Sequence, residues 1–243
     1  YDRALAAAQQ AGLAEADPTL DVTGIDSAHK IAIMAAMAFG VRVPFDQIPV
    51  EGIDSLDALD VGYGDQLGYV PKLLAIAERR EDAVRREDAV WVSVRPCFVP
   101  TDHPLAWVSG PFNAVSIYGN RTGHTMYYGR GAGGRPTAAA IVADLVSIAN
   151  GSYQRQVETV RVWPDLSEET DLGEPAGHEG RFYVRIMVED RPGQLGAIMT
   201  ILGDHGISVA RVLQHEPAEA GAHAVPVVVV THRAGEQQIK SAA

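Results

Sequence analysis

The chain has 243 residues, of which 47% are hydrophobic and 21% are charged, and its formal net charge is −11. This composition is typical of a soluble globular protein with a sizeable core, and the length suffices for one large domain or two small ones. The negative charge argues against nucleic acid or an anionic membrane as partner, and no apolar run approaches the length of a membrane span.

The chain is predicted to begin with two helices separated by an acidic segment. Residues 1–12 form the first helix, with Gly12 placed as its C′ glycine. The second helix follows in the stretch EADPTLDVTGIDSAHKIAIMAAMAFG. From Ser27 to Phe39 its only strongly polar side chains are His29 and Lys30. This pattern predicts a helix that is buried on all sides.

Lys30 follows Asp26 at the i, i+4 spacing that brings two side chains together on one helix face. The ordinary interpretation is that Asp26 caps the helix while Lys30 makes a salt bridge to it and reaches water. In a helix without a polar face, however, the ammonium would be desolvated and would need the carboxylates of Asp26, Asp21 and Glu15 around it. Buried lysines of this kind serve in proton transfer. The spacing alone leaves both interpretations open.

The middle of the chain is predicted to combine strands with two further helices. Residues 72–80 have helical spacing, and from Ala89 the pattern changes to the period of two that is typical of strands. Strands are predicted over 89–99, 113–119, 124–129 and 158–163, and a helix over 136–151.

A glycine-rich loop, GRGAGGRPT, joins the strand that ends at Gly129 to the helix that follows. Glycines let a ligand approach the backbone, and a helix start favours negative groups. An ordinary flexible loop is the alternative. The loop lacks the surroundings of a Rossmann fingerprint, because no acidic residue stands about 20 positions later.

Cysteine and histidine give no sign of a metal site. The single cysteine, Cys97, excludes an internal disulfide framework and fits a reducing, cytoplasmic location. We interpret it as a core residue. His29, His103 and His124 lack the spacing of metal ligands, so no metal is expected.

A compact module is predicted at the end of the chain, after an acidic linker at 164–180 that is rich in Pro and Gly. A strand over 181–189, a helix over 194–206, strands over 207–216 and 224–232, and the start of a helix give the order β-α-β-β-α. A ferredoxin-like βαββαβ module needs one further strand, so we expect the module to continue beyond this sequence.

Four stretches resemble the homoserine dehydrogenase family, in the family's own order. GLAEADPTLDVTGIDSAHKIAIM resembles its substrate-binding segment, and GPFNAVSIYG and GRGAGGRPTAAAIVADL resemble two further blocks. FYVRIMVEDRPGQLGAIMTILGDHGISVARVLQHE is similar to the ACT domain that many bacterial members carry. The resemblance implies an α+β fold: a mixed-sheet catalytic and dimerisation domain at 1–163, a linker at 164–180, and an ACT regulatory domain at 181–243 that is incomplete at its C-terminus.

The family's activity, carried over as an expectation, is the NAD(P)-dependent interconversion of L-homoserine and L-aspartate 4-semialdehyde, on the route to threonine, methionine and isoleucine. Lys30 matches the family's proton-transfer lysine. Glu15 and Asp26 match carboxylates that bind the amino group and hydroxyl region of the substrate, and Asp21 matches a further acidic residue of that site. The positions matching residues beside the nicotinamide cofactor are Gly12, Gly131, Ala132 and Gly133.

The resemblance also implies a dimer or tetramer and feedback regulation by an amino acid. Threonine is the expected effector, at the loop DRPGQLG, with Asp190, Gly193 and backbone carbonyls of the strand beginning at Ile207 as candidate contacts. Family members begin with a Rossmann domain that holds most of the dinucleotide, with a monovalent-cation site at its border. Since neither is found in this sequence, we expect the chain to be part of a longer enzyme and inactive alone.

Two rival functions stay open. One is a non-catalytic amino-acid sensor, in which the ACT domain is the working part and Lys30 is dispensable. The other is a related dehydrogenase acting on another small aldehyde, which would turn over a substrate without an amino group and would have no use for Glu15.

Overall fold

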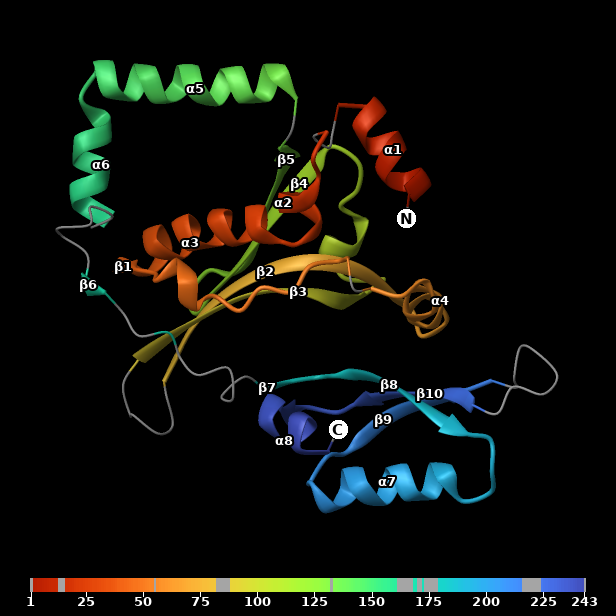
Figure 1. Ribbon diagram of the computed structural model, residues 1–243. Helices are drawn as coiled ribbons and strands as arrows, with labels where there is room; N and C mark the ends of the chain where they lie inside the picture. Colours follow the sequence, from red (N-terminus) through yellow and green to blue (C-terminus); the bar gives the residue numbers. More distant parts are fainter. Residues whose placement is uncertain are drawn as a thin grey trace. The chain divides into compact units, whose positions relative to one another are not determined.

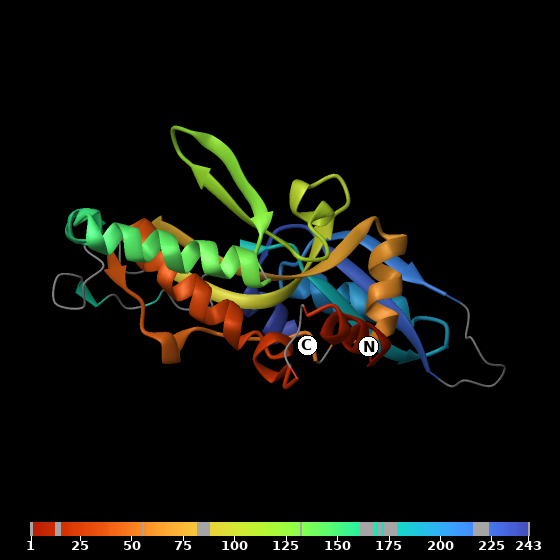
Figure 2. The same ribbon diagram turned by 90° about the horizontal axis from the view of Figure 1, so that it is seen from above.

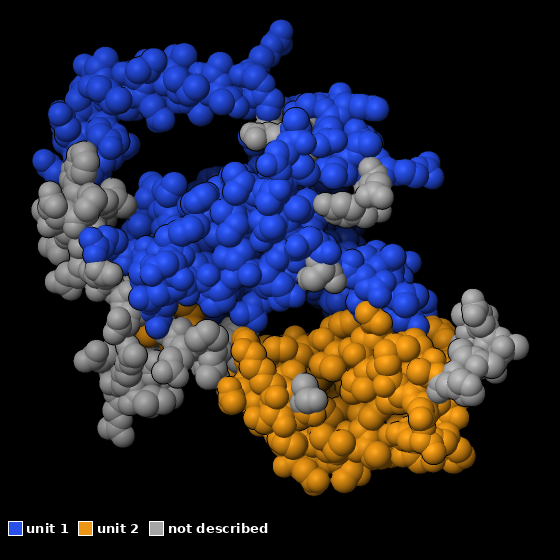
Figure 3. Space-filling model, in the orientation of Figure 1, with its two compact units in different colours: residues 1–80, 92–172 blue, residues 81–91, 173–243 orange. Residues whose placement is uncertain are grey.

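The structure is a computed structural model, and it divides the chain into two compact units (Figure 3). The first unit comprises residues 1–80 and 92–172, and the second comprises residues 81–91 and 173–243. The described residues are 2–12, 16–54, 56–81, 88–131, 133–160, 168–169, 172, 179–215 and 224–242. Since the predicted linker at 164–180 lies mostly outside them, the domain boundaries stay a prediction.

The first part of the chain mixes helices with paired strands (Figures 1 and 2). Its helices are α1 (Asp2–Gln10), α2 (Thr19–Val22), α3 (Ile25–Phe39), η1 (Phe45–Gln47), α4 (Ala58–Gln66), η2 (Pro104–Trp107), α5 (Gly134–Ala149) and α6 (Ser152–Val160). Its strands are β1 (Val41–Arg42), β2 (Tyr69–Glu81), β3 (Asp88–Pro100), β4 (Phe112–Gly119), β5 (Gly123–Arg130) and β6 (Glu168–Glu169).

These strands pair two by two. β1 pairs with β6 in parallel, β2 pairs with β3, and β4 and β5 form an antiparallel hairpin from Phe112↔Arg130 to Gly119↔Gly123. The buried side chains of β3 include Val92, Val94 and Val99. Val92 and Val94 alternate with the less buried residues at 91, 93 and 95. Such alternation is what a strand with one packed face requires.

Two secondary-structure predictions for this part were wrong. Residues 72–80 lie in the strand β2, because pairing with β3 over its length outweighs the helical spacing of the apolar residues. Of the strand expected over 158–163, residues 158–160 are instead the end of helix α6, and residues 161–163 lie outside the described residues. That helix starts after Gly151, whose φ is 72°, and the Asn150 side chain accepts a hydrogen bond from the Ser152 N–H at 2.9 Å.

The expectation that α3 is buried on all sides was also wrong. Its buried residues are Ala28, Ile31 and Ala35, which form one narrow face. On other sides Ile33 is 63% exposed and Met37 is 54% exposed. Composition predicted an apolar helix correctly, but it could not tell which faces have a packing partner.

The last part of the chain has the predicted order of elements and confirms the α+β fold with a C-terminal ACT-like module. Its elements are β7 (Glu179–Gly180), β8 (Tyr183–Glu189), α7 (Gln194–Asp204), β9 (Val209–Gln214), β10 (Ala224–Thr231), β11 (Ala234–Gly235) and α8 (Glu236–Ala242). β8, β10 and β9 form an antiparallel sheet in that order, and β11 pairs with β7.

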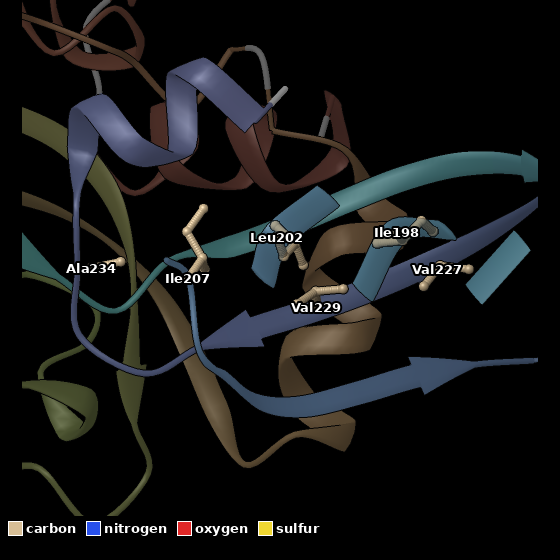
Figure 4. Close-up of a cluster of buried hydrophobic side chains, with 6 residues drawn as sticks. All are labelled: Ile198, Leu202, Ile207, Val227, Val229 and Ala234. Carbon is tan, nitrogen blue, oxygen red and sulfur yellow. The ribbon is translucent and has the colours of Figure 1, made fainter. Parts of the chain in front are cut away.

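A cluster of aliphatic side chains forms the core of this module (Figure 4). Its buried members come from α7, from β10 and from the segments beside them: Ile198, Leu202, Ile207, Val227, Val229 and Ala234. The strand expected to begin at Ile207 begins at Val209, because Ile207 is a buried core residue whose N–H donates to the Leu202 carbonyl at 2.8 Å.

Candidate active site

The acidic residues lie on a short helix and on the helix that follows it. Asp17 lies two residues before α2, and its carboxylate accepts hydrogen bonds from the Thr19 N–H at 3.1 Å and from the Thr19 hydroxyl at 2.5 Å. Gly24 then has φ 82° and serves as the N-cap of α3, whose first turn contains Asp26. The left-handed conformation at Gly24 lets the second helix start directly after the first.

Lys30 and Asp26 form an ion pair at the i, i+4 spacing, with the Lys30 ammonium donating to the Asp26 carboxylate. The Lys30 side chain is 58% exposed and that of Asp26 is 39% exposed. The desolvated lysine anticipated from an all-apolar helix is therefore not found. The pair faces outward, where a molecule binding at this surface would meet both charges at once.

Asp21 and Glu15 are less closely tied to this pair. Asp21 lies in α2 and is exposed, and among the described residues its carboxylate has no hydrogen bond or ion pair with a protein group. Glu15 lies outside the described residues. The structure therefore brings Asp26 and Lys30 together and leaves the Asp21 carboxylate available nearby in the chain.

The glycine-rich loop leaves β5 and enters α5. The Gly131 N–H donates to the Pro111 carbonyl at 3.2 Å, and Gly133, with φ 111°, is the N-cap of α5. A Cβ added at Gly131 would fall 1.8 Å from Nδ2 of Asn113, so the β4 side chain occupies the place of a side chain at 131. A larger residue at 131 would require the Asn113 side chain to turn aside. Ala132 lies outside the described residues.

Gly12, the remaining cofactor candidate, follows α1 with φ 66° and is exposed. This is the left-handed conformation of a C′ glycine. No hydrogen bond or ion pair among the described residues joins the Asp26–Lys30 pair to Gly12 or to the glycine-rich loop.

The candidate effector loop connects β8 to α7. Gly193 has φ 96° and is the N-cap of α7, and Asp190 is exposed. Next to them, Arg191 forms an ion pair with Glu189. The buried Ile207 side chain belongs to the core and cannot contact an effector, although its backbone stays a candidate.

Two side-chain arrangements were not anticipated from the sequence. One is the Asn113 amide over Gly131, which depends on the register of β4 and β5. The other is a group on the hairpin: Ser116 Oγ lies 2.7 Å from His124 Nε2, and the Tyr118 ring stacks on His124 with centroids 4.4 Å apart. Cys97 is not part of either, and burial raises the pKa of its thiol.

Comparison with known proteins identifies the family of the chain. The family profile for homoserine dehydrogenase matches residues 1–146, and the profile for the ACT domain matches residues 182–243. The chain belongs to the homoserine dehydrogenase family. It is 41% identical over 241 residues to a homoserine dehydrogenase of Pseudomonas aeruginosa, covering 98% of this chain and 54% of that protein.

Other members match over a similar share of the chain. A homoserine dehydrogenase of Mycobacterium bovis is 42% identical, covering 96% of this chain and 53% of that protein. The crystal structure of a homoserine dehydrogenase from Thiobacillus denitrificans matches with a TM-score of 0.83 at 36% identity, covering 99% of this chain and 53% of that one. The crystal structure of S. aureus homoserine dehydrogenase at pH 7.5 matches with a TM-score of 0.65 at 27% identity. The match covers 99% of this chain and 54% of that one.

The chain thus spans about half the length of the curated relatives it matches. In the part of the chain that the structure describes, no helix is both long enough and apolar enough to cross a membrane.

Proposed function

We propose that this chain is the substrate-binding and regulatory part of an NAD(P)-dependent homoserine dehydrogenase, which interconverts L-homoserine and L-aspartate 4-semialdehyde. The observation that carries the proposal is the outward-facing Asp26–Lys30 pair at the start of α3, the helix that directly follows the one with the exposed Asp21 carboxylate. A substrate with an amino group and a neighbouring oxygen function needs both negative and positive partners, and this segment offers both.

Lys30 is the proposed acid–base group. In the reducing direction, hydride adds to the aldehyde carbon of L-aspartate 4-semialdehyde while the Lys30 ammonium gives a proton to the carbonyl oxygen, leaving the alcohol. In the oxidising direction, the neutral amine takes the hydroxyl proton back. Asp26, paired with Lys30, orients the ammonium and contributes negative charge for the substrate's amino group, together with Asp21 and Glu15.

A nicotinamide dinucleotide, when bound, supplies or accepts the hydride. Gly131 and the left-handed Gly133 have no side chains of their own, so a ligand on one side would meet the loop backbone and the Asn113 amide beside Gly131. Gly131, Ala132, Gly133 and Gly12 are the residues of this chain proposed to line it. The choice between NAD and NADP is not set by these backbone contacts.

The experiment compares two i, i+4 ion pairs whose lysines are both exposed, in the full-length protein. Lys30→Ala is expected to lower kcat by about 10²- to 10⁴-fold, the usual range for loss of an acid–base group. Lys240→Ala, which breaks the pair with Glu236 on α8, is the matched control, since the Lys240 side chain is 61% exposed against 58% for Lys30. Near-normal turnover in Lys30→Ala would support the sensor function.

A change of substrate distinguishes the proposed function from the second rival, a related dehydrogenase that acts on another small aldehyde. An aldehyde of the same length without the amino group should be reduced much more slowly, because the carboxylates at Asp21, Asp26 and Glu15 would lose their partner. Equal kcat/KM values for the two aldehydes would favour a related dehydrogenase of another aldehyde.

Self-association and effector binding complete the proposal. The β4–β5 hairpin is a two-stranded sheet that exposes large side chains: Val115, Ile117, Tyr118, Tyr127 and Tyr128. An isolated two-stranded ribbon is marginally stable, which supports a homodimer or tetramer in which it is covered. Sedimentation velocity of the full-length protein tests this.

In the second unit, Gly193 and Asp190 are proposed to bind threonine at the start of α7.

A further inference from the structure

The loop from Pro49 to Ile53, here called the 49–53 loop, ties the acidic segment to a buried strand. At one end, the Val94 N–H of β3 donates to the Pro49 carbonyl at 2.9 Å, and the Glu51 N–H donates back to Val94 at 2.8 Å. At the other end, the Ile53 N–H donates to the Val22 carbonyl at 2.8 Å. Val94 is 1% exposed, so the loop is anchored on the core of the first unit.

Gly52 is the point of closest approach between this loop and the acidic segment. Gly52 is buried, and a Cβ added to it would fall 2.2 Å from the Val22 carbonyl oxygen and 2.6 Å from the Thr23 Cα. Both are backbone atoms, which cannot turn aside as the end of a side chain can. The Asp54 Oδ1 atom would be 2.5 Å away as well. Any larger residue must therefore push the two backbones apart.

The same loop also supports the start of α3. A Cβ at Gly24 would lie 3.2 Å from Cγ1 of Val50 and equally 3.2 Å from Cγ1 of Val94. Val22 and Thr23 directly follow Asp21, and Gly24 caps the helix whose first turn holds Asp26. A shift at Val22 is therefore transmitted to the Asp21 carboxylate on one side and to the Asp26–Lys30 pair on the other.

We propose that Gly52 is a positioning residue: through its backbone contact with Val22 and Thr23 it sets where Asp21, Asp26 and Lys30 lie relative to the core. It does not touch substrate itself. This inference rests on the proposed function for its kinetic consequence, but the placement of the acidic segment can be measured without turnover.

The kinetic test uses Gly52→Ala in the full-length enzyme, with Gly62→Ala as matched control. Gly62 lies in α4 and has no heavy atom within 4 Å of an added Cβ. Gly52→Ala is expected to raise KM for homoserine by about 10-fold or more, since displacement of binding groups by an ångström costs up to about 10²-fold. Gly62→Ala should leave KM unchanged. A merely structural role would lower the amount of active enzyme without changing KM.

The second readout is amide hydrogen exchange over residues 19–31, measured on the same two variants. Faster exchange there in Gly52→Ala, and not in Gly62→Ala, is expected because the Ile53–Val22 hydrogen bond is lost or lengthened. If the wild-type enzyme does not turn over homoserine but this exchange difference appears, the proposed function fails and the positioning role stands. Unchanged exchange together with unchanged KM overturns the inference.

If Gly52→Ala does not fold, Val50→Ala tests the positioning role of the 49–53 loop at its other approach to the acidic segment, beside Gly24. The substitution changes no backbone group of the loop and removes the Val50 Cγ1 atom that lies beside Gly24. A several-fold rise in KM with a folded protein is the expected result, whereas a KM equal to that of the wild type contradicts the proposal.

Discussion

Arg79 of β2 closes the carboxyl end of α3 through two contacts with Phe39. Its guanidinium donates to the Phe39 carbonyl oxygen at 2.5 Å, and its Cζ atom lies 5.0 Å from the centre of the Phe39 ring. The last carbonyls of a helix lack intrahelical hydrogen-bond partners and carry partial negative charge. The Arg79 guanidinium donates a hydrogen bond to one of them, and its positive charge interacts favourably with the helix end and with the Phe39 ring.

Replacement of Arg79 should therefore destabilise the first unit. Arg79→Ala is expected to lower the free energy of unfolding by about 2–4 kcal/mol, the sum of a charge-assisted hydrogen bond and an exposed cation–π contact. Arg79→Lys should recover only part of the loss, since an ammonium cannot stack and donate in the same plane. Urea unfolding measures both variants. Arg121→Ala, in the β4–β5 turn, is the control, and an equal effect there would contradict the explanation.

Asp17 gives a prediction about pH. Hydrogen bonds from the Thr19 hydroxyl and N–H lower the pKa of the Asp17 carboxyl. A carboxyl whose pKa is lower in the folded state stabilises the fold above its unfolded pKa and loses this contribution as pH falls through its folded pKa. Wild type should thus be more stable than Asp17→Asn at neutral pH, with the difference vanishing in acid. Urea midpoints measured as a function of pH check this.

Thr19→Val separates the two donors to Asp17. It removes the hydroxyl and keeps the backbone N–H, so it should reduce the pH-dependent difference without abolishing it. NMR titration measures the pKa of the Asp17 carboxyl directly. A pKa at or above that of Asp17 in the unfolded chain would show that these hydrogen bonds do not form in solution.

The C-terminal module could be predicted from sequence because its signals are local. The pattern around Ile198 and Leu202 predicts a helix with one packed face, and the valine run of β10, which is buried from Val227 to Val230, predicts a buried strand. In the first unit the decisive contacts are distant in sequence. The apolar residues of β2 have helical spacing, and β2 is a strand because β3 pairs with it. This pairing cannot be seen in the local sequence of β2 alone.

In the candidate site, too, the local features could be predicted from sequence and the long-range ones could not. The spacing of Asp26 and Lys30 predicted their pairing, since i, i+4 neighbours meet on any helix. Their exposure could not be predicted, because it depends on which face of α3 finds a partner. The role of Gly52 was missed as well, since a glycine becomes indispensable only when another backbone, here that of Val22, approaches it.

The carboxylates of the site are expected to differ in kinetics. Asp26→Asn should lower kcat and raise KM for homoserine, together about 10²-fold in kcat/KM, because Asp26 holds Lys30 as well as meeting substrate. Glu15→Gln should act mainly on KM, since Glu15 is proposed only to bind the amino group. Steady-state kinetics of the full-length variants decide this, and equal, mild effects from both would favour a simple surface salt bridge.

Regulation gives the last prediction, at the start of α7. Gly193 has φ 96°, a conformation that a β-branched residue adopts only at a cost of about 1–3 kcal/mol, so Gly193→Val must rearrange the loop on which threonine is proposed to bind. The variant should relieve threonine inhibition and leave the uninhibited turnover of the full-length enzyme unchanged. Gly203→Ala, on the same helix with no heavy atom within 4 Å of the added Cβ, is the control and should stay inhibited. Calorimetry on the wild-type full-length protein supplies the direct measurement. If no heat of threonine binding is observed and inhibition is absent, the module serves assembly instead of sensing.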